Sequence, residues 1–209
     1  MKISIIDYSI GNVQSITNAL YNDDIEIILT DEEKLILDSD AVILPGVGAF
    51  NKAMIELNNR NLPKILSKFI KTGKPLLGIC LGMQLLLEES EEFEKTKGLG
   101  FCEGKVKKFP INFDVRFPHV SWNELRIKYD KDKTSLLDGI KETDSFYFVH
   151  SFICIPKNQS EVIATTNYGN HEFCSVIKKE NIYGCQFHPE KSGTFGNKIL
   201  KKFIEIAKK

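Results

Sequence analysis

The fold of this chain is decided by the stretch Pro75-Leu76-Leu77-Gly78-Ile79-Cys80-Leu81-Gly82-Met83-Gln84-Leu85-Leu86-Leu87-Glu88. Its first five residues form a short apolar run, which predicts a buried parallel strand, and residues 83–88 predict a helix. Cys80 lies at the tight turn between them, as the nucleophile does in a strand–turn–helix elbow. The glycines two residues before and after Cys80 favour this interpretation, because larger side chains would collide at so sharp a turn.

The residues around Cys80 do not by themselves establish that Cys80 is catalytic. The same residues also fit a buried structural cysteine beside a tight strand–helix turn. The other four cysteines are scattered along the chain, and no pair has the C-x-x-C spacing of a zinc or thioredoxin-type site. We expect these four to be small buried apolar residues. A catalytic role for Cys80 therefore requires partner residues elsewhere in the sequence.

Strand and helix patterns alternate through the first ninety residues. Apolar runs predict strands over residues 3–6, 25–29 and 41–44, and the spacing of apolar residues predicts helices over residues 13–20 and 63–72. This alternation is typical of a parallel sheet that is wrapped by helices.

Beyond Gly98 the pattern changes to short β-branched and aromatic runs. These runs predict added strands and hairpins over residues 145–155, 162–166, 174–177 and 182–187. A last helix is predicted over residues 195–209, where apolar residues follow one stripe. The fold class is therefore α/β, with a mostly parallel central sheet and added antiparallel strands in the second half.

A candidate base follows the predicted strand over residues 182–187, in the tripeptide His188-Pro189-Glu190. In an extended chain, residues i and i+2 point to the same side, and proline favours an extended segment. Glu190 can then accept a hydrogen bond from one imidazole nitrogen of His188, which leaves the other nitrogen to take a proton from the cysteine. Taken alone, the same tripeptide also fits a solvated loop.

A cysteine that attacks a carboxamide also needs N–H donors for the tetrahedral oxyanion. The amide of Leu81 is one candidate donor, and the loop Pro45-Gly46-Val47-Gly48, at the end of a predicted strand, is a second source. The loop also fits a plain tight turn. It is not a dinucleotide-binding fingerprint, because the third glycine is missing.

The remaining histidines carry less chemistry in their sequence context. His119 and His150 lie within apolar and aromatic stretches, so we interpret them as core or interface residues. His171 has the surroundings of a solvated turn residue. No set of residues implies a metal ion or an organic cofactor.

Composition excludes several other classes of function. Lysine plus arginine equals aspartate plus glutamate at 28 each, so no basic excess favours nucleic-acid binding. The apolar run after Met1 is too short for a signal peptide, and no apolar stretch reaches the ~20 residues of a membrane span. We expect a cytoplasmic protein in which residues 1–209 form a single domain.

The cysteine and histidine motifs, in this order, resemble those of class I (triad-type) glutamine amidotransferases. Further segments resemble the glutaminase subunits of imidazole glycerol phosphate synthases, and the resemblance runs essentially end to end. Those segments are Asp7-Tyr8-Ser9-Ile10-Gly11-Asn12, Pro118-His119-Val120-Ser121-Trp122-Asn123, Tyr147-Phe148-Val149-His150-Ser151 and His188-Pro189-Glu190-Lys191-Ser192-Gly193. The resemblance implies a three-layer, flavodoxin-like amidotransferase fold formed by a single glutamine amidotransferase type 1 domain.

The resemblance also implies a mechanism and a set of site residues. Cys80 attacks the glutamine carboxamide, His188 acts as base and then acid, and Glu190 orients His188. Glutamate and ammonia are released through a cysteine thioester. By the same resemblance, Val47, Gly48 and Leu81 form the oxyanion site, and the substrate is held by Gln84, Ser151 and Phe152.

A partner is implied in the same way. Ammonia passes to a (β/α)₈-barrel cyclase subunit in a heterodimer, for histidine biosynthesis and formation of a purine intermediate. The residues that match the partner face are Trp122, Asn123, Tyr147 and Lys191. Family glutaminases of this type are weak until the partner and its ligand are bound.

Two departures from the family pattern keep an alternative open. Ser9 replaces a common glycine, and Val120-Ser121 replaces Met-Gly before Trp122. A paralogue that supplies ammonia for amidination of a surface nonulosonic or other sugar would fit such changes. A catalytically silent subunit and a cysteine peptidase are two further alternatives, which the complete triad and Gln84, respectively, disfavour.

Overall fold

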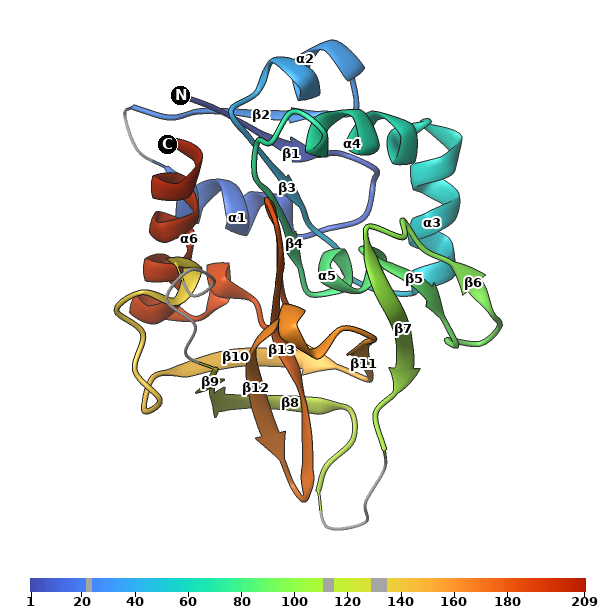
Figure 1. Ribbon diagram of the computed structural model, residues 1–209, viewed down its shortest axis with the longest axis vertical. Coiled ribbons are helices and arrows are strands. Elements are labelled where there is room, and N and C mark those ends of the chain that lie inside the picture. Colours follow the sequence, from blue (N-terminus) through green and yellow to red (C-terminus); the bar gives the residue numbers. More distant parts are fainter. Residues whose placement is uncertain (22–23, 111–114, 129–134) are drawn as a thin grey trace.

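The main sheet has eight strands in the order β2-β1-β3-β4-β14-β13-β12-β9 (Figure 1). The structure is a computed structural model that describes residues 1–21, 24–110, 115–128 and 135–209. Neighbouring strands are parallel from β2 to β14 and antiparallel from β14 to β9. The parallel strands are β1 (Lys2–Ile6), β2 (Glu26–Thr30), β3 (Ala41–Leu44), β4 (Leu76–Ile79) and β14 (Ile182–Cys185). The antiparallel strands are β9 (Arg126–Ile127), β12 (Val162–Tyr168) and β13 (His171–Lys179).

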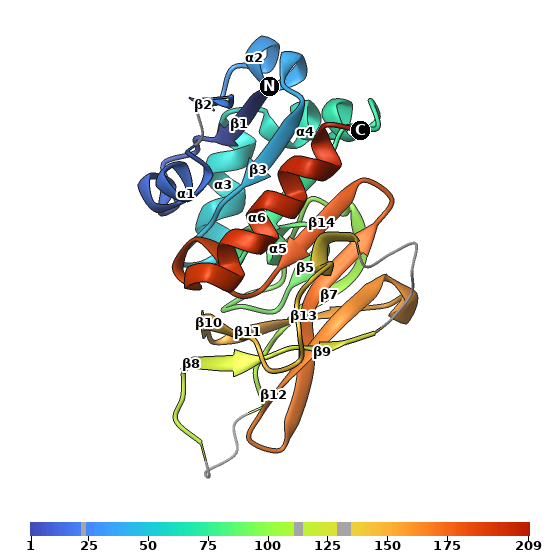
Figure 2. The ribbon, with the colours of Figure 1, turned by 90° about the vertical axis from the view of Figure 1, so that its left-hand side faces the viewer.

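Helices cover both faces of the parallel part of the sheet, as Figure 2 shows. One face carries α1 (Val13–Leu20) and α6 (Gly193–Ala207). The other face carries α2 (Glu33–Asp38), α3 (Phe50–Asn59) and α4 (Leu62–Ile70). The result is the three-layer α/β arrangement that the sequence predicted.

Each face of the sheet has its own hydrophobic core. In β1, Ile3 and Ile5 pack with residues of α1 and α6, whereas Ile6 packs with residues of α2, α3 and α4. Every residue of β3 and of β4 is buried. These strands are continuous apolar runs because both of their faces are covered, which is the usual reason in parallel sheets.

Two smaller sheets flank the carboxyl edge of the main sheet. One has four strands in the order β11-β7-β5-β6, and the other pairs β10 with β8. Their bounds are β5 (Leu87–Ser90), β6 (Thr96–Lys97), β7 (Cys102–Lys108), β8 (His119–Glu124), β10 (Ser145–His150) and β11 (Phe152–Pro156). The short 3₁₀ helices are η1 (Ser135–Leu137), η2 (Gln159–Glu161) and η3 (Pro189–Lys191).

The helix predicted over residues 83–88 is wrong in its extent. Helix α5 spans Leu81–Leu85, and Leu87 begins strand β5. The carbonyl groups of residues 85–87 accept hydrogen bonds from the backbone amides of residues 99–102, which come more than ten residues later in the sequence. This long-range pairing ends the helix early despite the good helix propensity of three consecutive leucines. Helices α2 and α3 were not predicted.

Within the described residues, no helix is both long enough and apolar enough to cross a membrane.

Candidate active site

Three neighbouring parallel strands bring the predicted site together. Strand β4 pairs with β3 on one side and with β14 on the other. The loop Pro45–Gly48 follows β3, Cys80 follows β4, and His188 follows β14 by three residues. The carboxyl ends of adjacent parallel strands lie at one edge of the sheet, where α/β proteins form their sites. The topology therefore places the predicted oxyanion loop, the predicted nucleophile and the predicted base side by side.

Cys80 occupies the strained turn that the sequence predicted. Its backbone has φ 55° and ψ −110°, which is uncommon for a residue with a side chain. A Cβ atom on Gly78 would lie 2.7 Å from the carbonyl of Gly82, and one on Gly82 would overlap the carbonyl oxygen of Leu44. Glycine is thus required on both sides of Cys80, because the elbow packs on itself and on β3.

His188 has the hydrogen bond expected of a catalytic base. Its Nδ1 atom lies 2.8 Å from Oε1 of Glu190, and both side chains are buried. Its Nε2 atom is also buried and has no hydrogen-bond partner among the described residues. Burial lowers the pKa of His188, but interactions with Cys80 and Glu190 outweigh this effect and raise the pKa. Nε2 is therefore the nitrogen available for proton transfer.

The local backbone around His188 differs from the prediction. Pro189–Lys191 forms the 3₁₀ turn η3, so the segment is not extended beyond His188. The amide of His188 donates to the carbonyl of Tyr147, and its carbonyl accepts from the hydroxyl of Ser192. The tight turn brings Glu190 back to the imidazole ring, so the expected side-chain pair forms by a different geometry.

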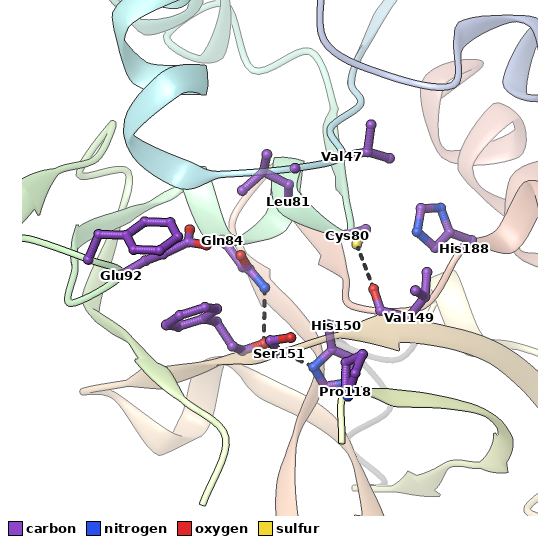
Figure 3. Close-up of a pocket in the computed structure, with 13 residues that line it drawn as sticks. Val47, Cys80, Leu81, Gln84, Glu92, Pro118, Val149, His150, Ser151 and His188 are labelled. Carbon is purple, nitrogen blue, oxygen red and sulfur yellow. Dashed lines mark hydrogen bonds between the residues drawn. The ribbon is translucent and has the colours of Figure 1, made fainter. Parts of the chain in front are cut away.

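A pocket of about 450 Å³ opens in front of Cys80 (Figure 3). That volume suits a small-molecule substrate. Glu190, whose carboxylate is paired with Nδ1 of His188, does not line the pocket. All the other predicted catalytic, oxyanion and substrate residues do: Val47, Gly48, Cys80, Leu81, Gln84, Ser151, Phe152 and His188.

The amide of Gln84 is fixed at one side of this pocket. Its Nε2 atom donates to the carbonyl of Phe152 and to Oε1 of Gln186, each at 3.1 Å. The Nε2 atom of Gln186 lies 3.8 Å from the sulfur of Cys80. Gln84, Gln186 and Cys80 therefore form a connected polar group, of which Gln84 and Cys80 line the pocket.

The loop after β3 is held against the elbow by close packing. A Cβ atom on Gly46 would lie 2.8 Å from Cβ of Leu81 and 2.9 Å from the Tyr8 hydroxyl. That hydroxyl is buried and donates a 2.5 Å hydrogen bond to the carbonyl of Pro45. Gly48 has φ 92°, a conformation that glycine adopts without strain.

Glu92 is a pocket residue that the sequence analysis missed. Its carboxylate lines the pocket, and Oε2 accepts a 2.7 Å hydrogen bond from the amide of Phe50, at the start of α3. Burial raises the pKa of Glu92. In the sequence this residue lies among several glutamates, which is the usual composition of a solvated surface. No local signal separates it from its neighbours.

The residues predicted to meet a partner lie beside the triad. Trp122 is 53% exposed, and its ring lies 5.8 Å from the ring of Tyr147. The Tyr147 ring lies 6.5 Å from the His188 ring. Lys191 is exposed and Asn123 is half-buried. Among the described residues, no group of His, Cys, Asp and Glu side chains could hold a metal ion.

Comparison with protein families gives a match over nearly the whole chain. The model of the family "Glutamine amidotransferase class-I" matches residues 4–207. The chain belongs to the class-I glutamine amidotransferase family. Among solved structures, this amidotransferase is similar in fold to the protein described as "Crystal structure of glutamine amidotransferase". The TM-score is 0.75 at 19% identity, and 99% of each chain is covered. A structure of PurLQS from Thermotoga maritima has a TM-score of 0.73 at 18% identity, with 98% of this chain and 97% of that chain covered.

Sequence relatives place the amidotransferase within a narrower family. The protein named "Imidazole glycerol phosphate synthase subunit HisH" from Listeria innocua is 47% identical over 98% of this chain and 95% of its own length. The relative of that name from Prochlorococcus marinus subsp. pastoris is 43% identical, over 98% of this chain and 98% of its own length. The one from Aquifex aeolicus is 40% identical, over 100% of this chain and 99% of its own length. The chain belongs to the HisH family. These names favour a synthase subunit over a sugar-amidinating paralogue.

The structure shows where the two departures from the usual family pattern lie, at Ser9 and at Val120-Ser121. Ser9 has φ 63°, and its hydroxyl accepts a 2.8 Å hydrogen bond from Arg60. Val120 and Ser121 lie on β8, opposite residues of β10. Neither departure falls among the residues that line the pocket.

Proposed function

We propose that this amidotransferase is the glutaminase subunit of imidazole glycerol phosphate synthase, with residues 1–209 acting as one catalytic domain. Cys80, His188 and Glu190 are its catalytic triad. The observation that carries the proposal is the hydrogen bonding of the two ring nitrogens of His188. One ring nitrogen is bound to Glu190, and the other is buried with no hydrogen-bond partner in the part of the chain that the structure describes, beside a cysteine on a strained elbow.

In the first half of the reaction, the sulfur of Cys80 attacks the side-chain carbonyl carbon of glutamine. The thiol proton passes to Nε2 of His188, and Glu190 stabilises the imidazolium that forms. The tetrahedral oxyanion is bound by the amide of Leu81 and by the loop that contains Val47 and Gly48. The carbon–nitrogen bond then breaks as His188 gives its proton to the leaving ammonia, which leaves a γ-glutamyl thioester on Cys80.

In the second half, water takes the place that ammonia has left. His188 removes a proton from the water as its oxygen attacks the thioester carbon. The carbon–sulfur bond breaks, the sulfur of Cys80 recovers its proton from His188, and glutamate leaves. The net reaction converts glutamine and water to glutamate and ammonia, with no oxidant, reductant or cofactor required.

The pocket offers groups for the amino-acid end of glutamine. Glu92 provides a carboxylate for the α-ammonium group, and Gln84 provides an amide whose nitrogen is already bound to the protein. Ser151 and Phe152 line the same side of the pocket. A charged partner and a fixed amide together select a free amino acid over an amide within a peptide.

We further propose that the ammonia passes to a (β/α)₈-barrel cyclase subunit in a heterodimer. The cyclase uses it to convert a phosphoribulosyl nucleotide into imidazole glycerol phosphate and an aminoimidazole carboxamide ribotide, a step of histidine biosynthesis. The face around Trp122, Asn123, Tyr147 and Lys191 meets the partner. The exposed Trp122 and the closeness of Tyr147 to His188 support this choice.

The test is glutamate release from glutamine, measured for the chain alone and with the cyclase subunit of the same organism, with and without a nucleotide ligand of that cyclase. Strong stimulation by the liganded cyclase supports the proposal. Slow hydrolysis that depends on Cys80 but is not stimulated would retain the glutaminase and assign its ammonia to another acceptor, such as a sugar. Absence of any hydrolysis under all conditions would contradict the proposal.

A further inference from the structure

Two buried histidines outside the proposed triad contact each other at the substrate pocket, which His150 lines. Nδ1 of His119 lies 2.8 Å from Nε2 of His150. His119 is fully buried and His150 is 6% exposed. They come from strands β8 and β10, where they are directly opposite each other. The proposed reaction uses neither ring, so the pair needs a separate explanation.

The hydrogen-bond partners determine which nitrogen of each ring carries a proton. Nδ1 of His150 lies 2.9 Å from the carbonyl oxygen of Phe152, and a carbonyl can only accept. His150 therefore donates from Nδ1. Burial and the neighbouring His119 lower the pKa of His150 to about 3, so Nε2 carries no proton. Nε2 therefore accepts a hydrogen bond from the Nδ1–H group of His119.

The carbonyl of Phe152 joins this pair to the substrate pocket. It accepts a second hydrogen bond from Nε2 of Gln84, so both of its lone pairs are used and its direction is fixed. The second hydrogen on Nε2 of Gln84 goes to Gln186. With both of these hydrogens bound to protein, the Oε1 atom of Gln84 is the part of the amide that is left for glutamine.

Packing holds the ring of His119 in place. The His119 ring is stacked on the ring of Tyr168, with centroids 3.9 Å apart. Nε2 of His119 lies 2.8 Å from Oδ1 of Asn123, but a neutral ring that donates from Nδ1 has no proton at Nε2, and an amide oxygen can only accept. The pair is therefore not connected to Asn123 by a hydrogen bond while both rings are neutral.

We propose that His119 and His150 are positioning residues that hold Gln84 in its substrate-binding orientation. The inference rests on the proposed glutaminase function and adds two residues that support its substrate site. His119 keeps the proton of His150 on Nδ1, and His150 and Gln84 both donate to the carbonyl of Phe152. Each link is short, buried or half-buried, and directional.

The experiment compares the KM and kcat for glutamine of His150 variants in the complex with the cyclase subunit. His150→Phe keeps a ring but removes the donor to Phe152, and we expect its KM to rise about fivefold, the equivalent of one hydrogen bond, with kcat within about twofold. His150→Asn can place an N–H where Nδ1 lies, so its KM should return most of the way to the wild-type value. A purely structural histidine would lower thermal stability in both variants without this split.

His119→Phe tests the support of His150. The variant keeps the stack on Tyr168 but removes the donor to Nε2 of His150, which keeps the proton of His150 on Nδ1. We expect the KM for glutamine to rise above the wild-type value and to stay below that of His150→Phe. If His150→Phe does not fold, this variant and His150→Asn carry the test.

Several results would overturn the inference. These are an unchanged KM in folded His150→Phe, a His150→Asn variant with a KM as poor as that of His150→Phe, and an unchanged KM in His119→Phe. A Cys80→Ser variant is measured in parallel. Glutamine hydrolysis that persists in Cys80→Ser would contradict the proposed function, whereas the other failures would leave that function intact and remove only the positioning role of the two histidines.

Discussion

The backbone amide of Cys80 donates a 2.8 Å hydrogen bond to the carbonyl of Cys185, the last residue of β14. This bond extends the pairing of β4 and β14 by one residue, to the point where each strand leaves the sheet. The nucleophile and the loop that carries the base are therefore placed relative to each other by sheet pairing. A catalytic pair that is fixed by the backbone loses little precision to side-chain motion.

Cys80→Ser should abolish glutamine-dependent turnover and leave the ammonia-dependent reaction of the cyclase intact. A serine hydroxyl is far less acidic than a thiol, so His188 cannot activate it in this setting. The two reactions are measured in the reconstituted complex, with glutamine or an ammonium salt as the nitrogen source. Full activity with glutamine would remove Cys80 from its role.

Glu190→Gln should lower kcat for glutamine by roughly 10²–10⁴-fold, the usual contribution of a correctly oriented acid–base group. The substitution keeps the size of the side chain but removes the charge that stabilises the imidazolium of His188. The matched control is Glu205→Gln, at an exposed carboxylate paired with Lys202 on α6, which should leave kcat unchanged. Equal kcat values for Glu190→Gln and wild type would show that His188 works without an orienting carboxylate.

Gly82→Ala should lower the free energy of unfolding by roughly 2–4 kcal/mol, because the added Cβ overlaps the carbonyl oxygen of Leu44. Gly139→Ala is a suitable control. That position has φ 80° and open space around its Cα atom, so only backbone strain of about 1 kcal/mol is added. Urea denaturation of both variants measures the difference. A smaller loss for Gly82→Ala than for Gly139→Ala would contradict the packing argument.

The lowered pKa of His150 predicts a loss of stability in acid. The unfolded chain binds a proton at His150 below the ordinary histidine pKa of 6.5, whereas the folded chain does so only near the lowered value of about 3. Stability from this residue is therefore complete above pH 6.5 and is lost as the pH falls below it. Between pH 6.5 and 5 the loss is about 2 kcal/mol.

His150→Asn removes this titration, so its free energy of unfolding should fall less than that of the wild type between pH 6.5 and 5. Urea denaturation at the two pH values measures the change for each protein. His119, whose pKa is also lowered by burial, remains in both proteins and contributes to the change in each of them. An equal change in both would mean that His150 is protonated in the folded chain.

Trp122→Ala should weaken binding to the cyclase subunit by about 2 kcal/mol or more, because exposed tryptophans that become buried are typical anchors of interfaces. Ile55→Ala, at another exposed apolar residue on α3 and away from Tyr147, is the control. Titration calorimetry gives both affinities. Comparable losses for the two variants would move the interface away from the face around Trp122.

The sequence was sufficient for those parts of the site that depend on local backbone geometry. The glycines around Cys80 indicate a tight turn, and the spacing of His188 and Glu190 indicates a pair of side chains close in sequence. A single stretch of chain can encode each of these features. Strand β3 was predicted with its observed bounds, because a buried parallel strand is a continuous apolar run.

The parts that could not be predicted depend on contacts between distant segments. Helix α5 ends at Leu85 because residues 99–102 bind its last carbonyl groups, and nothing near Leu85 signals this. Glu92 becomes a pocket residue because its carboxylate reaches the amide of Phe50. The bond between His119 and His150 requires β8 and β10 to pair. In each case the deciding partner is more than ten residues away.

Strand β14 lies between β4 and β13 in the middle of the sheet, although it is the last strand in the sequence. During synthesis on the ribosome, Cys80 emerges long before residues 182–188, and until they follow, one edge of β4 has no neighbour. A nascent polypeptide that ends before His188 therefore carries the proposed nucleophile without its proposed base. The order of the strands thus delays assembly of the proposed triad until residues 182–190 have been synthesised and β14 has paired with β4.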